Sequence, residues 1–284
     1  RSAHTIEGMA SIQVLTGPLD DERRSEALFG GDLLIFKDVA PLRRFSTLVG
    51  ELLTAVFGDT PQHAQFDLSP DEFTARAHDV VGRCRRHPAA LQGFRDALRH
   101  VGVDLDRSYW DWLHLRIQPH QDFTEAGSLG YHRDTWSSNI DAQTNWWTPV
   151  LPITRERTIA LYPAYWSRPL ANTSASWDLQ RVREMPLVPR PCEPVNADSE
   201  VRIVIEPGDL LCFSGAHLHA SVPNTSGATR FSVEVRTVAA IDVQAGRGAR
   251  RGAHGPADHR GLRRPQRAVR ARRRPPLVVH SEAS

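Results

Sequence analysis

Apolar positions in the first hundred residues recur mostly at helical spacing. Over residues 40–57 they return every three or four positions, which predicts an amphipathic helix. A serine followed by a proline opens a second helix over 69–86, because serine caps a helix and proline suits its first turn. A third helix follows over 88–100, and one short apolar run at 31–36 predicts a buried strand. We therefore expect a mainly helical N-terminal part over about 9–105.

The pattern changes to short alternating runs after residue 106. Aromatic and β-branched residues alternate with polar ones in segments bounded by turn signals such as Pro207-Gly208. The predicted strands are 109–118, 144–151, 158–162, 201–205, 210–213, 217–222 and 229–238. No helical pattern separates them, which favours a sandwich or barrel over a doubly wound sheet. We expect a mainly β fold with flanking helices, with its core at about 106–243 of a single domain over 9–243.

A histidine and an aspartate two positions apart form the first candidate for chemistry. His132 and Asp134 lie in the segment GYHRDTW, and on an extended strand such residues point to the same side. An imidazole nitrogen and a carboxylate oxygen suit a borderline divalent ion such as Fe(II). Since His-x-Asp pairs arise often by chance, the interpretation needs a third ligand elsewhere.

A second segment with histidines follows a Pro-Gly-Asp turn. The apolar run after that turn leads to His217 and His219, which would share one face of a strand. Either histidine would complete a triad of two histidines and one carboxylate with the first pair. Such a triad fills three positions on iron and leaves three for a cosubstrate and O₂.

The third feature is Arg230 followed two positions later by Ser232. An arginine can bind a carboxylate through two parallel hydrogen bonds, and the serine hydroxyl adds another. Arg230 comes 11 residues after His219, enough for a turn and a return along the next strand. It is therefore placed to hold the far carboxylate of a dicarboxylate whose other end chelates iron.

These segments, in this order, resemble the phytanoyl-CoA dioxygenase-like branch of the Fe(II)/2-oxoglutarate oxygenases. The resemblance covers roughly residues 30–240 and is carried by His132-Arg-Asp134, Gly208-Asp209, His219-Ala-Ser221, Asn224-Thr-Ser226 and Arg230-Phe-Ser232. It implies a double-stranded β-helix core, the jelly roll of cupin-like proteins. It also implies Fe(II), with 2-oxoglutarate and O₂ as cosubstrates, and oxidation of a small molecule while 2-oxoglutarate is decarboxylated to succinate.

The resemblance also decides between alternatives that the residues leave open. Its spacing to Asn224 and Arg230 favours His219 over His217 as the metal ligand. Halogenating relatives replace the carboxylate ligand with a small residue, so the presence of Asp134 favours hydroxylation. A further pair, His120-Gln-Asp122, lacks the lead residues of the first motif, and we interpret it as a decoy.

Other polar and aromatic residues are candidates for the remaining contacts. Arg116 and Gln118 alternate inward on their strand and are expected to contact 2-oxoglutarate or substrate, although a surface-facing pair would look the same. Asn145 is a candidate cosubstrate contact and Trp146 a candidate substrate contact, but alternation lets only one of these neighbours face the site.

An aromatic and polar connection over 162–177 is expected to cover the substrate. We predict substrate contacts from its Tyr165 and Arg168, and from Trp136 beside the first metal motif. An ordinary packed loop would explain the same residues.

The charges divide the chain into an acidic body and a basic end. From residue 244 onward there are 11 arginines and two acids, which leaves 24 basic and 31 acidic residues before it, a net charge of −7. A nucleic-acid-binding arm, a disordered tail and an out-of-frame end each fit the basic segment 244–284. Because the chain has 34 arginines and one lysine, as a GC-rich gene encodes, we favour the out-of-frame end and predict no nucleic-acid partner.

Composition limits the setting of the protein. Three cysteines with no ligand spacing favour a reducing, cytoplasmic compartment over a disulfide framework. No apolar run is long enough to span a bilayer, so we expect no membrane partner. Met9 is a candidate natural start, which would make residues 1–8 a non-native addition.

Two further interpretations stay open beside the oxygenase. A cupin-like isomerase or hydrolase would share the metal triad but would not need Arg230 and Ser232. A non-catalytic carbohydrate-binding sandwich would use the tryptophans without iron. For the oxygenase and for the cupin-like enzyme, the expected partner is a small-molecule substrate. No motif predicts the oligomeric state.

Overall fold

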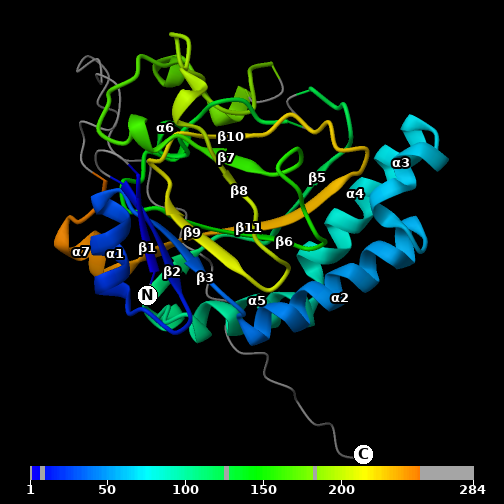
Figure 1. The fold of residues 1–284 in the computed structure, drawn as a ribbon, viewed down its shortest axis with the longest axis horizontal. Helices are drawn as coiled ribbons and strands as arrows, with labels where there is room; N and C mark the ends of the chain where they lie inside the picture. Colours follow the sequence, from blue (N-terminus) through cyan, green and yellow to red (C-terminus); the bar gives the residue numbers. More distant parts are fainter. Residues whose placement is uncertain (1, 7–9, 125–127, 182–183, 250–284) are drawn as a thin grey trace, which may run out of the picture.

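The computed structural model describes residues 2–6, 10–124, 128–181 and 184–249. It contains two β-sheets and a layer of helices, with the larger sheet lying between the smaller sheet and helices α2, α4 and α5 (Figure 1). None of the described helices is long and apolar enough to cross a membrane.

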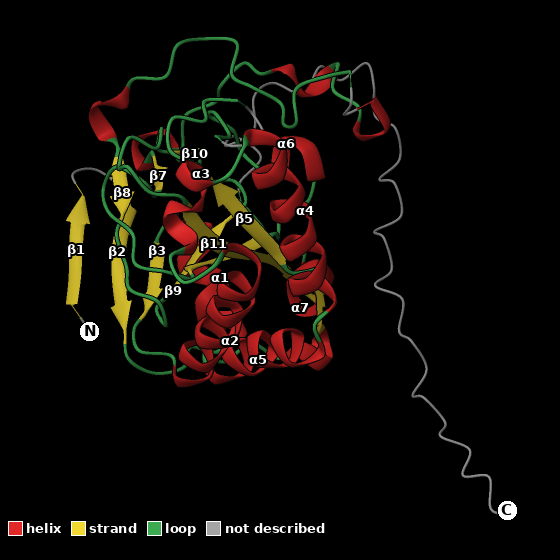
Figure 2. Ribbon diagram, turned by 90° about the vertical axis from the view of Figure 1, so that its right-hand side faces the viewer, coloured by secondary structure: helices red, strands yellow, loops and turns green. Residues whose placement is uncertain are grey.

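The larger sheet has eight strands and joins segments from both ends of the chain. Its pairings are antiparallel except for β2 with β3, and β4 and β5 pair with different parts of β11. In spatial order its strands are β1 (Ser2–Ile6), β2 (Ala10–Leu15), β3 (Leu33–Phe36), β9 (Leu210–Ser214), β6 (Thr144–Pro149), β11 (Arg230–Ala239) and β4 (Ser108–Trp110), with β5 (His114–Gln118). Figure 2 shows β1, β2 and β3 side by side, away from helix α4.

The smaller sheet covers one face of the larger one. Its order is β10 (His219–Ser221), β7 (Ile159–Leu161) and β8 (Val201–Ile203). Side chains from both sheets pack between them, with Leu33, Trp147 and Leu211 from the larger sheet meeting Ile159 and Ile203 from the smaller one. This core holds the two sheets face to face, as in other packed sheets.

Helices α2, α4 and α5 pack on the opposite face of the larger sheet. The apolar stripe of α2 meets α5, where the rings of Phe45 and Phe94 contact edge to face at 5.3 Å. The N-terminus of α4 carries a capping box between Ser69 and Glu72. The helices are α1 (Asp21–Gly30), α2 (Ala40–Phe57), α3 (Ala64–Asp67), α4 (Pro70–Arg86), α5 (Pro88–His100), α6 (Thr135–Ser138) and α7 (Ala240–Ala245). Short 3₁₀ turns lie at Pro61–His63, Leu105–Arg107, Pro163–Tyr165, Thr173–Ala175, Leu179–Arg181 and Ala197–Ser199.

The helical predictions are confirmed, whereas the mainly β description needs correction. The three predicted helices correspond to α2, α4 and α5, but helices hold more residues than strands, so the fold is mixed. The strand predicted over 109–118 is split into β4 and β5. The N-terminal part also supplies β3, which pairs with β9, so a division at about residue 105 does not separate helices from sheet.

The folded body also extends past the boundary expected after Val243. The backbone N–H of Ala249 donates to the carbonyl of Asp141 at 3.0 Å, and the Ala249 side chain is buried against Trp166. Residues 244–249 therefore belong to the body. The rest of the predicted tail, 250–284, and residues 1 and 7–8 of the predicted addition lie outside the described residues.

Candidate metal centre

His132, Asp134 and His219 converge between the two sheets. One ligand atom from each lies within 4.8 Å of the others, and all three side chains are buried. Nε2 of His132 lies 3.6 Å from Oδ1 of Asp134, and the two imidazole rings are 4.2 Å apart at their centroids. Among the described residues, no other cluster of three histidine, cysteine or acidic side chains meets this spacing.

The backbone fixes how the triad is assembled. His132 and His219 exchange two backbone hydrogen bonds of 3.0 Å each, which tie the loop before α6 to strand β10. Asp134 has helical dihedral angles (φ −61°, ψ −32°) and immediately precedes α6. The predicted extended strand at this motif is therefore wrong. A turn into a helix brings both side chains to the site instead.

Each histidine presents its Nε2 atom to the centre. Nδ1 of His132 lies 2.7 Å from the carbonyl oxygen of Gly130, and Nδ1 of His219 lies 3.0 Å from that of His217. A carbonyl only accepts hydrogen bonds, so both Nδ1 atoms carry the proton and both Nε2 lone pairs are available to a metal. Burial, and then the neighbouring His219, lower the pKa of His132 to about 4, which keeps its ring neutral.

Two hydrogen-bond donors and one arginine surround one oxygen of the Asp134 carboxylate. Oδ2 accepts hydrogen bonds from Asn145 (2.5 Å) and Gln143 (3.2 Å), and Nε of Arg236 lies 3.5 Å away. Burial alone would raise the pKa of Asp134, but Arg236 and the two triad histidines together lower it. The carboxylate is therefore ionised, and Oδ1 is the oxygen turned toward His132.

His217 lies outside the triad. The chain turns between β9 and β10, so His217 and His219 do not share a strand face as expected. Nε2 of His217 lies 2.9 Å from the carbonyl oxygen of Gly31, and its ring stacks 4.4 Å from Trp166. Of the two candidate histidines, the structure thus brings only His219 to the centre.

Strand β11 carries a row of polar side chains toward the smaller sheet. Its residues 231, 233 and 235 pack in the helix-facing core, so the alternate residues 230, 232, 234 and 236 face the other way. The register sets Gln118 opposite Arg230 and Arg116 opposite Ser232. Arg230 and Ser232, predicted to bind a carboxylate, therefore lie beside Arg116 and Gln118, predicted to contact 2-oxoglutarate or substrate.

These four side chains have hydrogen-bonding atoms without partners. Arg230 donates from Nη1 to the carbonyl of Thr158 at 2.6 Å, but its Nε has no partner. Nε of Arg116, Oε1 of Gln118 and Oγ of Ser232 are likewise buried and unpaired within the described structure.

Arg230 is also a buried cation; Glu234 opposes the lowering of its pKa but forms no ion pair with it. Arg230 is 4% exposed, and no carboxylate of the described residues forms an ion pair with it. Burial, and then the nearby Arg116, lower its pKa to about 9. Because an unpaired buried charge is costly, the group formed by Arg116, Gln118, Arg230 and Ser232, called below the carboxylate pocket, fits a carboxylate supplied by a ligand.

Asn145 and Trp146 point to opposite faces of β6, as alternation requires. Asn145 faces the site but bonds to Asp134, so it supports a metal ligand. Trp146 lies in the helix-facing core, where its Nε1 donates to Oγ1 of Thr237 at 2.8 Å. Trp146 therefore faces away from the site, which contradicts the predicted substrate contact.

The other predicted substrate residues lie around the loop after β7. Trp136 is buried in α6 with its Nε1 unpaired, whereas the Arg168 side chain is 53% exposed and lies 3.5 Å from Glu193. The Tyr165 hydroxyl accepts from the backbone N–H of Asn196 at 2.7 Å. The loop is packed, and this hydrogen bond fixes the orientation of the Tyr165 side chain.

Sequence reasoning missed Arg133, Gln143 and Arg236. Nη2 of Arg133, buried between two triad members, donates to the carbonyls of Tyr165 (2.5 Å) and Arg168 (2.9 Å). It therefore fastens the loop to the metal motif. Only Arg236 had a signal in the sequence, because it continues the two-residue period of Arg230 and Ser232.

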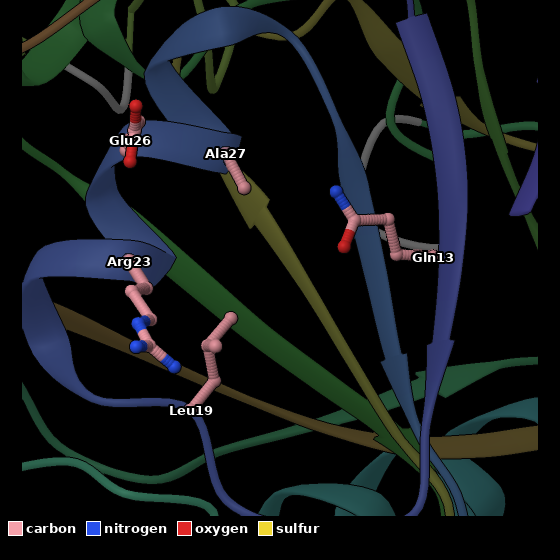
Figure 3. A pocket seen from close by; sticks show the side chains of 5 residues that line it. All are labelled: Gln13, Leu19, Arg23, Glu26 and Ala27. Atoms are coloured by element: carbon pink, nitrogen blue, oxygen red, sulfur yellow. The ribbon is translucent and has the colours of Figure 1, made fainter. Parts of the chain in front are cut away.

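Two other features lie outside the centre. Nδ1 of His120 accepts from the backbone N–H of Gly227 at 3.1 Å, and Asp122 caps Thr124, so this pair serves local turns. A separate pocket of about 450 Å³ lies between β2 and α1 (Figure 3). Its lining consists of Gln13, Leu19, Arg23, Glu26 and Ala27, which include no group of the metal centre.

Comparisons with known proteins give only distant similarities. No protein-family model and no curated protein match the chain. Among solved structures, EvdO2 from Micromonospora carbonacea var. aurantiaca is 16% identical with a TM-score of 0.47, over 80% of this chain and 94% of that one. The epimerase SnoN, solved with Fe³⁺, alpha ketoglutarate and nogalamycin RO, is 12% identical with a TM-score of 0.45, over 77% and 83%. The non-heme monooxygenase ThoJ is 15% identical with a TM-score of 0.40, over 72% and 74%.

Proposed function

We propose that the chain is an Fe(II)/2-oxoglutarate-dependent oxygenase that hydroxylates a small molecule. One observation carries the proposal: a buried triad of two histidines and a carboxylate lies between the two sheets, and a buried arginine of the larger sheet, with no described ion pair, faces the smaller sheet. Arg236, within β11, approaches Asp134. Arg230, the first residue of β11, lies on the same face with its Nη2 3.5 Å from the hydroxyl of Ser221, which follows His219 by two positions in β10. A metal and a dicarboxylate would therefore be held side by side.

The donor set fits ferrous iron. Two neutral imidazoles and one ionised carboxylate suit Fe(II) and leave three positions free. Iron bound there would supply oxygen activation, with 2-oxoglutarate as the reductant that ends as succinate and CO₂. The hydrogen bonds to Oδ2 of Asp134 favour coordination through Oδ1 alone, which keeps those positions free.

The protein would orient the cosubstrate through its side chains. Arg230 and Ser232 would bind the carboxylate far from the metal, with the Ser221 hydroxyl 3.5 Å from Nη2 of Arg230. Arg116 and Gln118 would supply their unpaired atoms to the same ligand. The loop that Arg133 fastens would help to exclude water from the reaction.

The finer assignments also belong to this proposal. The order of the motifs supports a place in the phytanoyl-CoA dioxygenase-like branch, and two facing sheets around the triad support a jelly-roll core. The Asp134 carboxylate occupies the place that a halide would need, which supports hydroxylation. The three cysteines are free, which favours a reducing compartment such as the cytoplasm.

An anaerobic titration with Fe(II) and 2-oxoglutarate tests the proposal. We expect a weak visible metal-to-ligand charge-transfer band that needs both additions, because only a keto acid chelated to iron produces it. Asp134→Ala should abolish the band. A well-folded, iron-loaded protein without the band would contradict the proposal and favour a cupin-like enzyme that does not use 2-oxoglutarate.

A further inference from the structure

A chain of alternating charges connects the metal centre with the carboxylate pocket. It begins at Asp134, whose Oδ2 lies 3.5 Å from Nε of Arg236. Nη2 of Arg236 donates to Oε1 of Glu234 at 2.5 Å. The same Glu234 oxygen lies 3.5 Å from Nη2 of Arg116, which faces the pocket. Neither Arg236 nor Glu234 is assigned a role by the proposed chemistry.

Glu234 stands at the middle of this chain and is ionised. It shares one face of β11 with Arg236, and its side chain is 17% exposed, so water screens its charge only weakly. Burial alone would raise the pKa of Glu234, but Arg236 and Arg116 together hold it at about 2. Its negative charge is thus shared between two arginines that belong to different halves of the site.

Arg116 ends the row of alternating charges and is held more loosely than the other members. Among the described residues its ion pair is the 3.5 Å contact with Glu234, its Nε is unpaired, and its side chain is 37% exposed. It also lies close enough to Arg230 to depress the pKa of that buried arginine. An incoming dicarboxylate relieves this repulsion and attracts Arg116 away from Glu234.

We propose that Glu234 is a positioning residue that couples dicarboxylate binding to metal binding. When Arg116 turns to the ligand, Glu234 keeps Arg236 as its counterion. Glu234 then neutralises Arg236 more fully. Arg236 therefore offsets less of the negative charge of Asp134, and the triad binds a cation more tightly. By linkage, a bound metal strengthens dicarboxylate binding by the same factor. This inference rests on the proposed function of the site.

The experiment measures Co(II) affinity, by absorbance of the apoprotein, with and without saturating glutarate. Glutarate has both carboxylates of the cosubstrate but no keto group to chelate the metal. Wild type is compared with Glu234→Gln, which removes the central charge. Asp111→Asn is the matched control, because Asp111 also pairs with Arg236, at 3.5 Å, whereas the ion pair of Arg116 among the described residues is with Glu234.

In wild type, glutarate should strengthen Co(II) binding, and this factor should be at least about fivefold larger than in Glu234→Gln. Asp111→Asn should keep the wild-type factor, although its Co(II) affinity without glutarate falls. An equal factor in wild type and Glu234→Gln would overturn the coupling while leaving the proposed function intact. Failure of glutarate to bind wild type would instead remove the carboxylate pocket, and the inference with it.

A second variant covers the case in which Glu234→Gln does not fold. Arg116→Gln changes the more exposed end of the chain, and thermal melting of each apoprotein establishes that it is folded. The factor at saturating glutarate should again fall at least about fivefold below wild type. A folded Arg116→Gln protein with the wild-type factor would contradict the coupling.

Discussion

At the scale of single residues, the chemistry depends on which nitrogen each histidine presents. The carbonyls of Gly130 and His217 fix the Nδ1 protons of His132 and His219. Each ring is therefore held in one tautomer, with its Nε2 lone pair facing the centre. His217 has both ring nitrogens near carbonyl oxygens and none turned to the triad. Two histidines only two positions apart therefore have different roles.

This difference predicts opposite effects of two alanine substitutions. His219→Ala should lose tight Fe(II) or Co(II) binding, because it removes one of three ligands. His217→Ala should keep metal binding but melt at a lower temperature, since it leaves a cavity beside Trp166. Metal titration and thermal melting of both apoproteins measure the pair of effects. Weaker metal binding in His217→Ala than in His219→Ala would reverse the assignment.

At the scale of elements, strand β11 has one face that packs in the core beneath the helices and one face that points to the proposed binding site. Val233 is fully buried among core side chains beneath the helices, whereas Arg230 faces the site as an unpaired cation. Alternation along one strand thus places a core residue and a proposed ligand-binding residue three positions apart.

The two faces predict a crossed pattern of effects. Arg230→Met should weaken 2-oxoglutarate binding by about 2–5 kcal/mol, as expected for one partner of a buried charge pair. It should not destabilise the ligand-free protein, because a methionine replaces an uncompensated buried charge. Val233→Ala should lower the free energy of unfolding by about 1–3 kcal/mol and leave 2-oxoglutarate affinity unchanged. Calorimetric titration and denaturant unfolding distinguish this pattern from a uniform loss in both variants.

Periodicity predicted the elements better than the contacts between them. The bounds of α2 match the predicted range 40–57, because an apolar stripe against a core is a local signal. The carbonyl of Gly31 that holds His217 lies 186 positions away in the sequence, and Arg236 approaches Asp134 from about one hundred positions away. Residue spacing along one strand contains no information about such distant partners, so the triad could be predicted and its supporting donors could not.

At the scale of the whole molecule, the C-terminal end of the body closes against the N-terminal helix. Asp242 in α7 is buried and accepts a hydrogen bond from Ser25 of α1 at 2.6 Å. Arg247 lies 3.1 Å from Asp242 and 3.1 Å from Glu22. Burial raises the pKa of Asp242, and Arg247 opposes that shift. Arg247 thus compensates a buried acid, and Ala249 packs against Trp166.

Two shortened chains separate this closure from the basic end. A chain ending at Ala249 removes 10 of the 11 arginines counted from residue 244 onward but keeps Arg247. A chain ending at Val243 also removes Arg247 and leaves Asp242 buried without it. We expect the shorter chain to be less stable by about 2 kcal/mol, which lowers its melting temperature by roughly 4–8 °C.

The same pair of chains tests what the basic end contributes to function. If the site acts as proposed, the chain ending at Ala249 should bind Co(II) and 2-oxoglutarate as tightly as the full chain, since every residue of the centre precedes Ala249. Nucleic-acid affinity that disappears with this truncation would show a separate role for the basic end. Equal melting temperatures for the two shortened chains would contradict the closure, because the ion pairs of Arg247 and the burial of Ala249 would then contribute nothing measurable.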